Sequence, residues 1–111
     1  MITTQSCVFC AIINGESPAN ILYNNDQLVV IENVLNWAPI MLLIIPKIHI
    51  SQEEMWSDEL MSSVGKVAIS VGKLICPDGF RLLSNLGNDA MQSQDHAHLH
   101  VVGGAYLGPY V

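Results

Sequence analysis

The sequence has few positively charged residues. Its only lysines and arginines are Lys47, Lys66, Lys73 and Arg81, and with ten acidic residues the formal net charge is −6. Proteins that bind nucleic acids use many lysines and arginines to displace counterions from the phosphates. This shortage argues against a nucleic-acid partner. If the protein binds a phosphate, it must do so locally, with backbone N–H groups and imidazoles.

Segments that target, anchor or link domains are also missing. Residues 1–6 have neither the basic end nor the apolar run of a signal peptide. The longest aliphatic run, Ile40 to Ile45, is far too short to span a membrane. No repeat, low-complexity tract or linker-like stretch interrupts the 111 residues, half of which are hydrophobic. We therefore expect a single soluble domain over residues 1–111, in the cytoplasm and without a membrane partner.

Cysteine occurs in an odd number, at positions 7, 10 and 76. An odd count without an export signal argues against a disulfide framework. Cys7 and Cys10 form a C-x-x-C pair, but a thioredoxin-like redox role would need a βαβ unit nearby, and none is evident. The pair could belong to the core of a short helix or supply half of a zinc site, and spacing alone does not decide between the two.

Hydrophobic spacing predicts an α+β fold on a largely antiparallel sheet, because most strands are joined by short connections. The expected helices are a short one over 7–13, followed by Gly15, and a long one from an N-cap at Ser57 to Pro77. The expected strands are 21–23, 27–32, 40–45, 80–84 and 96–102. Asn24 to Asp26 should turn the first hairpin, since these residues tolerate left-handed backbone geometry.

Two glycines lie inside the long predicted helix. Gly65 and Gly72 each cost about 1 kcal/mol relative to alanine in a helix. Their seven-residue spacing brings them near one face. We therefore expect both to compensate by packing closely against the sheet.

Three of the four histidines alternate along the last predicted strand, at positions 96, 98 and 100. Alternate residues of a strand point to the same face, so the three imidazoles should lie together. Such a row offers no packing advantage over valine and risks burying unsatisfied nitrogens. The pattern therefore predicts a chemical role.

Metal binding and nucleophilic catalysis are the two uses open to such a row. Neighbours on one strand face lie about 6.5–7 Å apart at their Cα atoms, so two of them could share an ion but three would be strained. Alternatively, an imidazole whose one nitrogen donates to a carbonyl can attack phosphorus with the other. A neighbouring histidine could then donate to the phosphate oxygens.

Residues 92–104 resemble the signature of the histidine triad (HIT) family, His-x-His-x-His followed by two apolar residues. They read Gln-Ser-Gln-Asp-His-Ala-His-Leu-His-Val-Val-Gly-Gly. Further similar segments are 7–16, 38–39 and 44–49, so the resemblance covers nearly the whole chain. The Gly-Gly pair after the triad is similar to the Hint branch.

The resemblance implies the HIT fold, a five-stranded antiparallel sheet with two helices, in a homodimer that joins two sheets into one. It implies hydrolysis or transfer at the α-phosphate of nucleoside phosphoramidates or dinucleoside polyphosphates, through a nucleotidyl-histidine intermediate. His98 matches the nucleophile and His100 the partner that contacts the phosphate. The positions matching the substrate site are Asn33, Val34, Asn85, Gln92 and Ser93.

The resemblance also bears on the cysteine pair. Bacterial relatives that carry this C-x-x-C bind zinc, and the matching ligands here are Cys7, Cys10, His49 and His96. A closed four-ligand site is structural, so the ion would tie the N-terminal segment to the sheet. His96 would then be a metal ligand and not a catalytic residue.

Three positions depart from the family pattern. Asn33 stands where an aspartate usually grips the ribose, Met41 replaces a histidine, and Met91 replaces the glycine of a Gly-Gln-Ser phosphate loop. Asn33 and Met91 keep open a second reading, a nucleotide-binding or partner-binding protein with little turnover. A third reading makes the histidines a metal store or sensor.

Overall fold

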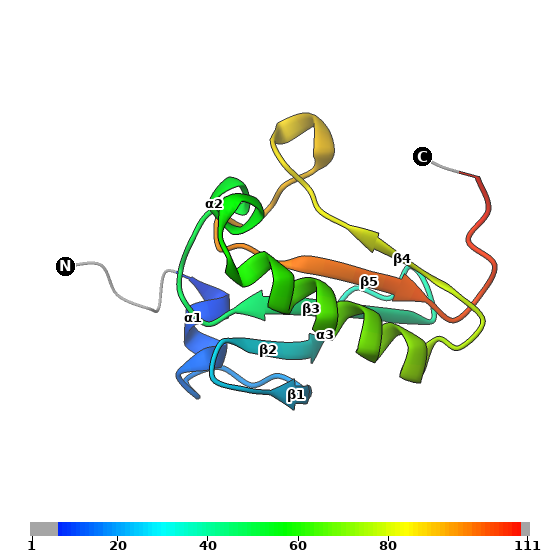
Figure 1. Ribbon diagram of the computed structural model, residues 1–111, viewed down its shortest axis with the longest axis horizontal. Coiled ribbons are helices and arrows are strands. Elements are labelled where there is room, and N and C mark those ends of the chain that lie inside the picture. Colours follow the sequence, from blue (N-terminus) through cyan, green and yellow to red (C-terminus); the bar gives the residue numbers. More distant parts are fainter. Residues whose placement is uncertain (1–6, 110–111) are drawn as a thin grey trace.

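The computed structural model describes residues 7–109 and contains a five-stranded antiparallel sheet in the order β1-β2-β3-β5-β4 (Figure 1). The strands are β1 (Ile21–Asn24), β2 (Leu28–Glu32), β3 (Ile40–Pro46), β4 (Phe80–Leu83) and β5 (Leu99–Gly103). The α-helices are α1 (Val8–Ile13), α2 (Gln52–Ser57) and α3 (Leu60–Ile75), with a short 3₁₀ helix, η2, at Asn88–Ala90. The predicted α+β fold and its five antiparallel strands are confirmed.

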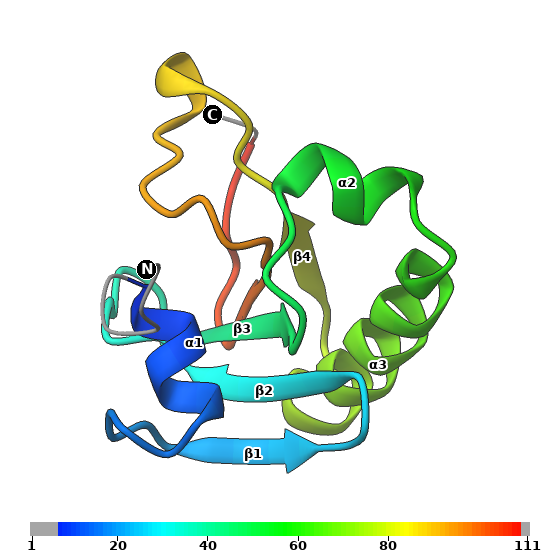
Figure 2. The same ribbon diagram turned by 90° about the vertical axis from the view of Figure 1, so that its left-hand side faces the viewer.

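Helices cover both faces of the sheet. In Figure 2, α1 lies on one side of β1, β2 and β3, and α3 lies on the other. Residues of β3 alternate between the two layers, so that Leu42 and Ile44 pack toward α3 while Leu43 and Ile45 pack toward α1. β3 is therefore a central strand covered on both faces. None of the helices in residues 7–109 combines the length and apolar character needed to cross a membrane.

Three α-helices form, where the resemblance implied two. The additional helix is α2, which begins at a capping box: Ser51 Oγ accepts from the Glu54 N–H, and Glu54 Oε1 accepts from the Ser51 N–H. The predicted N-cap at Ser57 is wrong, because Ser57 is the last residue of α2. The longer helix α3 begins at Leu60, whose N–H donates to the Asp58 carboxylate at 2.9 Å.

A side chain, and not left-handed backbone, turns the first hairpin. Asn25 Oδ1 accepts from the N–H groups of Gln27 and Leu28, both at 2.8 Å. None of residues 24–26 has a positive φ, so the expected left-handed geometry is wrong. An asparagine that bonds the backbone two residues ahead makes the turn without it.

Strand β5 is shorter than the predicted strand 96–102. Its pairing with β3 ends where Ile44 faces Leu99. Continuing this register would bring Ala97 opposite Pro46, which has no N–H to donate. The Ala97 N–H instead donates to the Ile50 carbonyl at 2.8 Å. Residues 96–98 therefore lie outside the β3–β5 ladder and lead into β5 at Leu99.

The two helical glycines have different surroundings. A Cβ on Gly72 would lie 2.4 Å from ring carbons of Phe80, whereas a Cβ on Gly65 would meet nothing within 4 Å. The predicted close packing is thus confirmed for Gly72 and wrong for Gly65. It joins α3 to β4.

These surroundings predict opposite effects of the same substitution. Gly65→Ala should raise the free energy of unfolding by about 1 kcal/mol, because alanine is the better helix former. Gly72→Ala should lower it by about 1–3 kcal/mol, because the methyl group must displace Phe80. Urea unfolding of both variants tests this packing, and equal effects would contradict it.

Candidate active site and metal centre

The central histidine of the triad is held in one tautomer. His98 Nδ1 lies 2.8 Å from the carbonyl oxygen of His96. A carbonyl can only accept, so Nδ1 carries the proton and donates it. Nε2 is left with its lone pair. A neutral imidazole with a free Nε2 lone pair can act as a nucleophile. His98 is buried, with 4% of its surface exposed.

Aromatic contacts surround the His98 ring. Its centroid lies 5.2 Å from that of Phe9 in α1 and 5.1 Å from that of His100 in β5. Burial lowers the pKa of His98 below its ordinary value. Burial also lowers the pKa of His100, to about 4, with a smaller contribution from His98. Both imidazoles are therefore neutral at pH 7, as nucleophilic attack requires.

A pocket of about 600 Å³ opens beside these two rings. His100 lines it from β5, His98 from the segment just before β5, and Phe9 and Ile12 from α1. No lysine or arginine lines it. Any phosphate bound here would be held by neutral donors, in keeping with the low content of basic residues.

The structure brings three of the five predicted substrate residues to this pocket. Asn33, Val34 and Ser93 line it, and Val34 is 98% exposed. Asn33 Oδ1 accepts from the Leu35 N–H at 3.0 Å, which leaves the Nδ2 donor for other contacts. A ribose would therefore meet a donor here, where a carboxylate would supply a charged acceptor.

Asn85 and Gln92 do not line the pocket. Asn85 Nδ2 donates to the Ala90 carbonyl at 2.7 Å, and Gln92 Oε1 accepts from the Gly87 N–H at 2.8 Å. Both side chains instead stabilise the loop that precedes the triad. Within it, Met91 has a φ of +60°, the left-handed conformation that glycine adopts without strain. Met91 therefore replaces the family's glycine, although the backbone keeps a conformation that glycine favours. The methionine is 73% exposed.

The four predicted metal ligands form one cluster. The donor atoms of Cys7, Cys10, His49 and His96 all lie within 4.8 Å of one another. His96 Nδ1 lies 3.4 Å from Cys7 Sγ and 3.5 Å from Cys10 Sγ, and His49 Nδ1 lies 3.2 Å from Cys10 Sγ. A tetrahedral zinc ion with ordinary bond lengths separates its donors by roughly 3.4–3.8 Å. The cluster therefore fits one such ion with little movement.

The protonation state of His96 suits metal binding. Its Nε2 lies 2.7 Å from the Pro46 carbonyl oxygen, so Nε2 carries the proton and Nδ1 presents a lone pair to the cysteines. Burial, together with hydrogen-bonding and charge interactions with Cys7, raises the pKa of Cys10 to about 11. A thiol with this pKa stays protonated at pH 7 unless a cation displaces the proton.

The geometry agrees with what comparisons with known proteins find. A model of the HIT domain matches residues 14–106 of the chain. The chain belongs to the HIT domain family. The family resemblance read from the histidine motif is therefore confirmed.

Several relatives of this HIT protein have informative names. The purine nucleoside phosphoramidase of Escherichia coli is 32% identical over 110 residues, which span 95% of this chain and 92% of the relative. A HIT family hydrolase from Clostridium thermocellum superposes with a TM-score of 0.88 at 34% identity, covering 98% of this chain and 99% of its own. A Zn-bound histidine triad family protein from Mycobacterium smegmatis gives a TM-score of 0.74 at 31% identity, covering 91% and 76%.

Two residues of the HIT site carry no sequence motif and were not predicted. Phe9 contacts the rings of both His96 and His98, although it lies inside the C-x-x-C pair. Gln52 Oε1 accepts from the His98 N–H at 3.1 Å. Phe9 could have been suspected from its place between two metal ligands, but no pattern marks Gln52.

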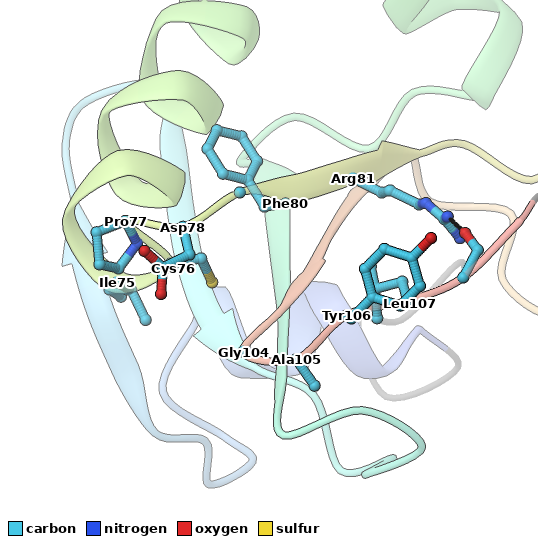
Figure 3. Close-up of a pocket in the computed structure, with 12 residues that line it drawn as sticks. Ile75, Cys76, Pro77, Asp78, Phe80, Arg81, Gly104, Ala105, Tyr106 and Leu107 are labelled. Atoms are coloured by element: carbon cyan, nitrogen blue, oxygen red, sulfur yellow. Dashed lines mark hydrogen bonds between the residues drawn. The ribbon is translucent and has the colours of Figure 1, made fainter.

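A second cavity of about 600 Å³ lies between the end of α3, β4 and the chain after β5 (Figure 3). Cys76, Phe80 and Tyr106 are among its lining residues, and the Arg81 guanidinium donates to the Gly108 carbonyl there. None of the four histidines lines it. The catalytic candidates of this HIT protein therefore belong to the other pocket.

The low pKa of His100 predicts a loss of stability in acid. The folded protein binds this proton near pH 4 and the unfolded chain near 6.5, so the contribution is present above pH 6.5 and is lost as pH falls to 4. Between pH 7 and 4, wild type should lose about 2 kcal/mol more unfolding free energy than His100→Asn. Urea unfolding measures the difference. A chelator keeps both proteins free of metal, so that loss of metal in acid does not contribute to it. Equal pH slopes would contradict the burial of a neutral His100.

Proposed function

We propose that this HIT protein is a nucleotide hydrolase or transferase that acts at an α-phosphate. Nucleoside phosphoramidates are the first substrates to consider, because the Escherichia coli relative is named a purine nucleoside phosphoramidase. Dinucleoside polyphosphates are the second. The observation that carries the proposal is the His98 imidazole, whose Nδ1–H donates to the His96 carbonyl while Nε2 stays free beside a pocket.

The proposed reaction has two steps. For a phosphoramidate, His98 Nε2 forms a bond to the α-phosphorus as the phosphorus–nitrogen bond to the leaving group breaks, and the leaving amine takes up a proton from solvent. Water then attacks the phosphorus of this nucleotidyl-His98 intermediate as the phosphorus–Nε2 bond breaks, which releases the nucleoside monophosphate, the neutral imidazole and a proton to solvent. His100, in contact with the His98 ring, would bind the phosphate oxygens, and Ser93 would donate to the phosphate from the pocket wall. Asn33 and Val34 would contact the nucleoside, while Asn85 and Gln92 would hold the phosphate loop in place.

We also propose that Cys7, Cys10, His49 and His96 bind one structural zinc ion. The short distances between their donor atoms and the free Nδ1 of His96 support this set. The Zn-bound relative from Mycobacterium smegmatis supports the choice of metal. Bound there, zinc would join α1 to the segment that follows β3, through His49, and to the segment that precedes β5, through His96. It would supply no reaction step, since all four positions of a tetrahedral ion are filled by protein.

We further propose that the protein is a homodimer and that it acts in the cytoplasm. Among the described strands β4 pairs only with β5, which leaves its outer edge open for a second sheet. Leu82 and Leu83 on that strand are 37% and 44% exposed. Light scattering on purified protein should give twice the chain mass, and a monomer at micromolar concentration would contradict the dimer.

A substrate panel tests the proposed activity. Adenosine and guanosine phosphoramidates and dinucleoside polyphosphates would each be incubated with the protein, and the products separated by chromatography. The expected product is the nucleoside monophosphate. Nucleotide binding measured by calorimetry, without turnover of any of these compounds, would instead favour the binding-protein alternative that Asn33 and Met91 suggest. More than one zinc per chain, with an affinity that depends on His98 and His100, would favour a metal store.

A further inference from the structure

Gln52 is a buried polar residue that lies next to the reacting histidine but lines neither cavity. It is the first residue of α2 and is 2% exposed. Its Oε1 accepts from the backbone N–H of His98, at 3.1 Å. Its Nε2 has no hydrogen-bond partner among the described residues. A glutamine buried with half of its amide unsatisfied adds little net stability.

Within residues 7–109, the backbone of His98 pairs with no strand of the sheet. The β3–β5 ladder ends where Ile44 faces Leu99, one residue after His98. Two backbone N–H groups just before the strand have acceptors outside the ladder: the Ala97 N–H donates to the Ile50 carbonyl, and the His98 N–H donates to Gln52 Oε1. Only the second contact is made at the reacting residue itself.

Helix α2 holds the glutamine firmly. The capping box of Ser51 and Glu54 fixes the first turn of the helix, in which Gln52 lies. Met55, on the same helix, is completely buried in the core. The Gln52 amide therefore reaches His98 from a rigid support, as placement of a catalytic group requires.

From this arrangement we infer that Gln52 is a positioning residue for the His98 nucleophile. By fixing the His98 N–H, it sets the backbone from which the imidazole projects and so the direction of Nε2 toward the pocket. The inference rests on the proposed function, because it assigns Gln52 a role through His98. Since Gln52 does not line the nucleotide pocket, its loss should lower kcat and leave KM nearly unchanged.

Two substitutions separate positioning from packing. Gln52→Leu keeps much of the volume but removes the acceptor, and kcat should fall roughly 10- to 100-fold with KM within about twofold of wild type. Gln52→Glu keeps an acceptor oxygen at the same place and should restore kcat to within about threefold of wild type. Met55→Ala is the matched control: it removes a buried side chain from the same helix, and kcat should remain within about twofold at a temperature where it is folded.

Hydrogen exchange tests the contact without any substrate. The His98 amide should exchange about tenfold faster in Gln52→Leu than in wild type, relative to the Ala97 amide, whose acceptor is the unchanged Ile50 carbonyl. The same ratio should not change in Met55→Ala. Because it compares neighbouring amides, the ratio is insensitive to a general loss of stability.

The outcomes distinguish this inference from the proposed function. If His98→Ala turns over substrate at the wild-type rate, the proposed function fails whatever Gln52 does. If His98→Ala is inactive but Gln52→Leu keeps wild-type kcat, or keeps the wild-type exchange ratio, the positioning role is overturned. An equal fall of kcat in Gln52→Leu and Met55→Ala would also overturn it, since that result indicates packing alone.

Discussion

Replacing His98 by alanine is expected to lower kcat/KM for a nucleoside phosphoramidate by roughly 10⁴-fold or more. The imidazole supplies the only nucleophile of the proposed first step, and no cysteine lines its pocket. His98 is held as the Nδ1–H tautomer by the His96 carbonyl, so that Nε2 is ready to attack without a prior proton transfer. Steady-state kinetics with the most active substrate of the panel measures the effect.

Folding and binding must be controlled in this experiment, because His98 is buried against Phe9. A second variant, His98→Asn, keeps a polar side chain and should be equally inactive. Both variants should bind the nucleoside monophosphate with a dissociation constant within about tenfold of wild type, since the other pocket residues are unchanged. Turnover near the wild-type rate in a folded variant would show that another group is the nucleophile.

Loss of one thiol from the metal centre should have the largest effect on stability. Cys7→Ser or Cys10→Ser is expected to purify without zinc, whereas wild type should hold one zinc per chain. A structural zinc stabilises the fold by its binding free energy, so each variant should lose at least about 3 kcal/mol. In a chain of this size that corresponds to a fall in Tm of about 10 °C or more. Elemental analysis and thermal unfolding measure the two quantities.

The third cysteine provides a matched control. Cys76 is buried at the end of α3 and lies outside the cluster, so Cys76→Ala should retain one zinc per chain. Chelation should lower the Tm of wild type and of Cys76→Ala, but not that of Cys7→Ser. Fully reduced wild-type protein that contains no zinc, or a Cys10→Ser variant that keeps it, would contradict the proposed metal centre.

The sequence predicted the features that depend on local pattern. The unbroken apolar run at 40–45 predicted a strand, and β3 lies there, with apolar neighbours on both faces. The alternating histidines were expected to lie together, and the His98 and His100 rings are in contact. The His96 carbonyl accepts from His98 Nδ1, but the His96 imidazole lies in the cysteine cluster. The family resemblance correctly grouped four residues that are up to 89 positions apart.

What the sequence did not predict depends on contacts between distant segments. Gln52 and His98 meet only because α2 lies beside the start of β5, and no spacing indicates this. The extra helix was missed because its capping signal, Ser51 with Glu54, spans only one helical turn. Asn85 and Gln92 were assigned to the substrate from the family resemblance alone, yet their side chains are hydrogen-bonded within the loop.

The proposed covalent intermediate on His98 can be detected by intact-protein mass spectrometry. Protein would be mixed with a nucleoside phosphoramidate, quenched within milliseconds to seconds and kept near neutral or alkaline pH to preserve the phosphorus–nitrogen bond. We expect an added nucleoside monophosphoryl group that peptide mapping places on His98 and that is absent in His98→Ala. Turnover with no adduct at any quench time, or with the adduct on another residue, would contradict it.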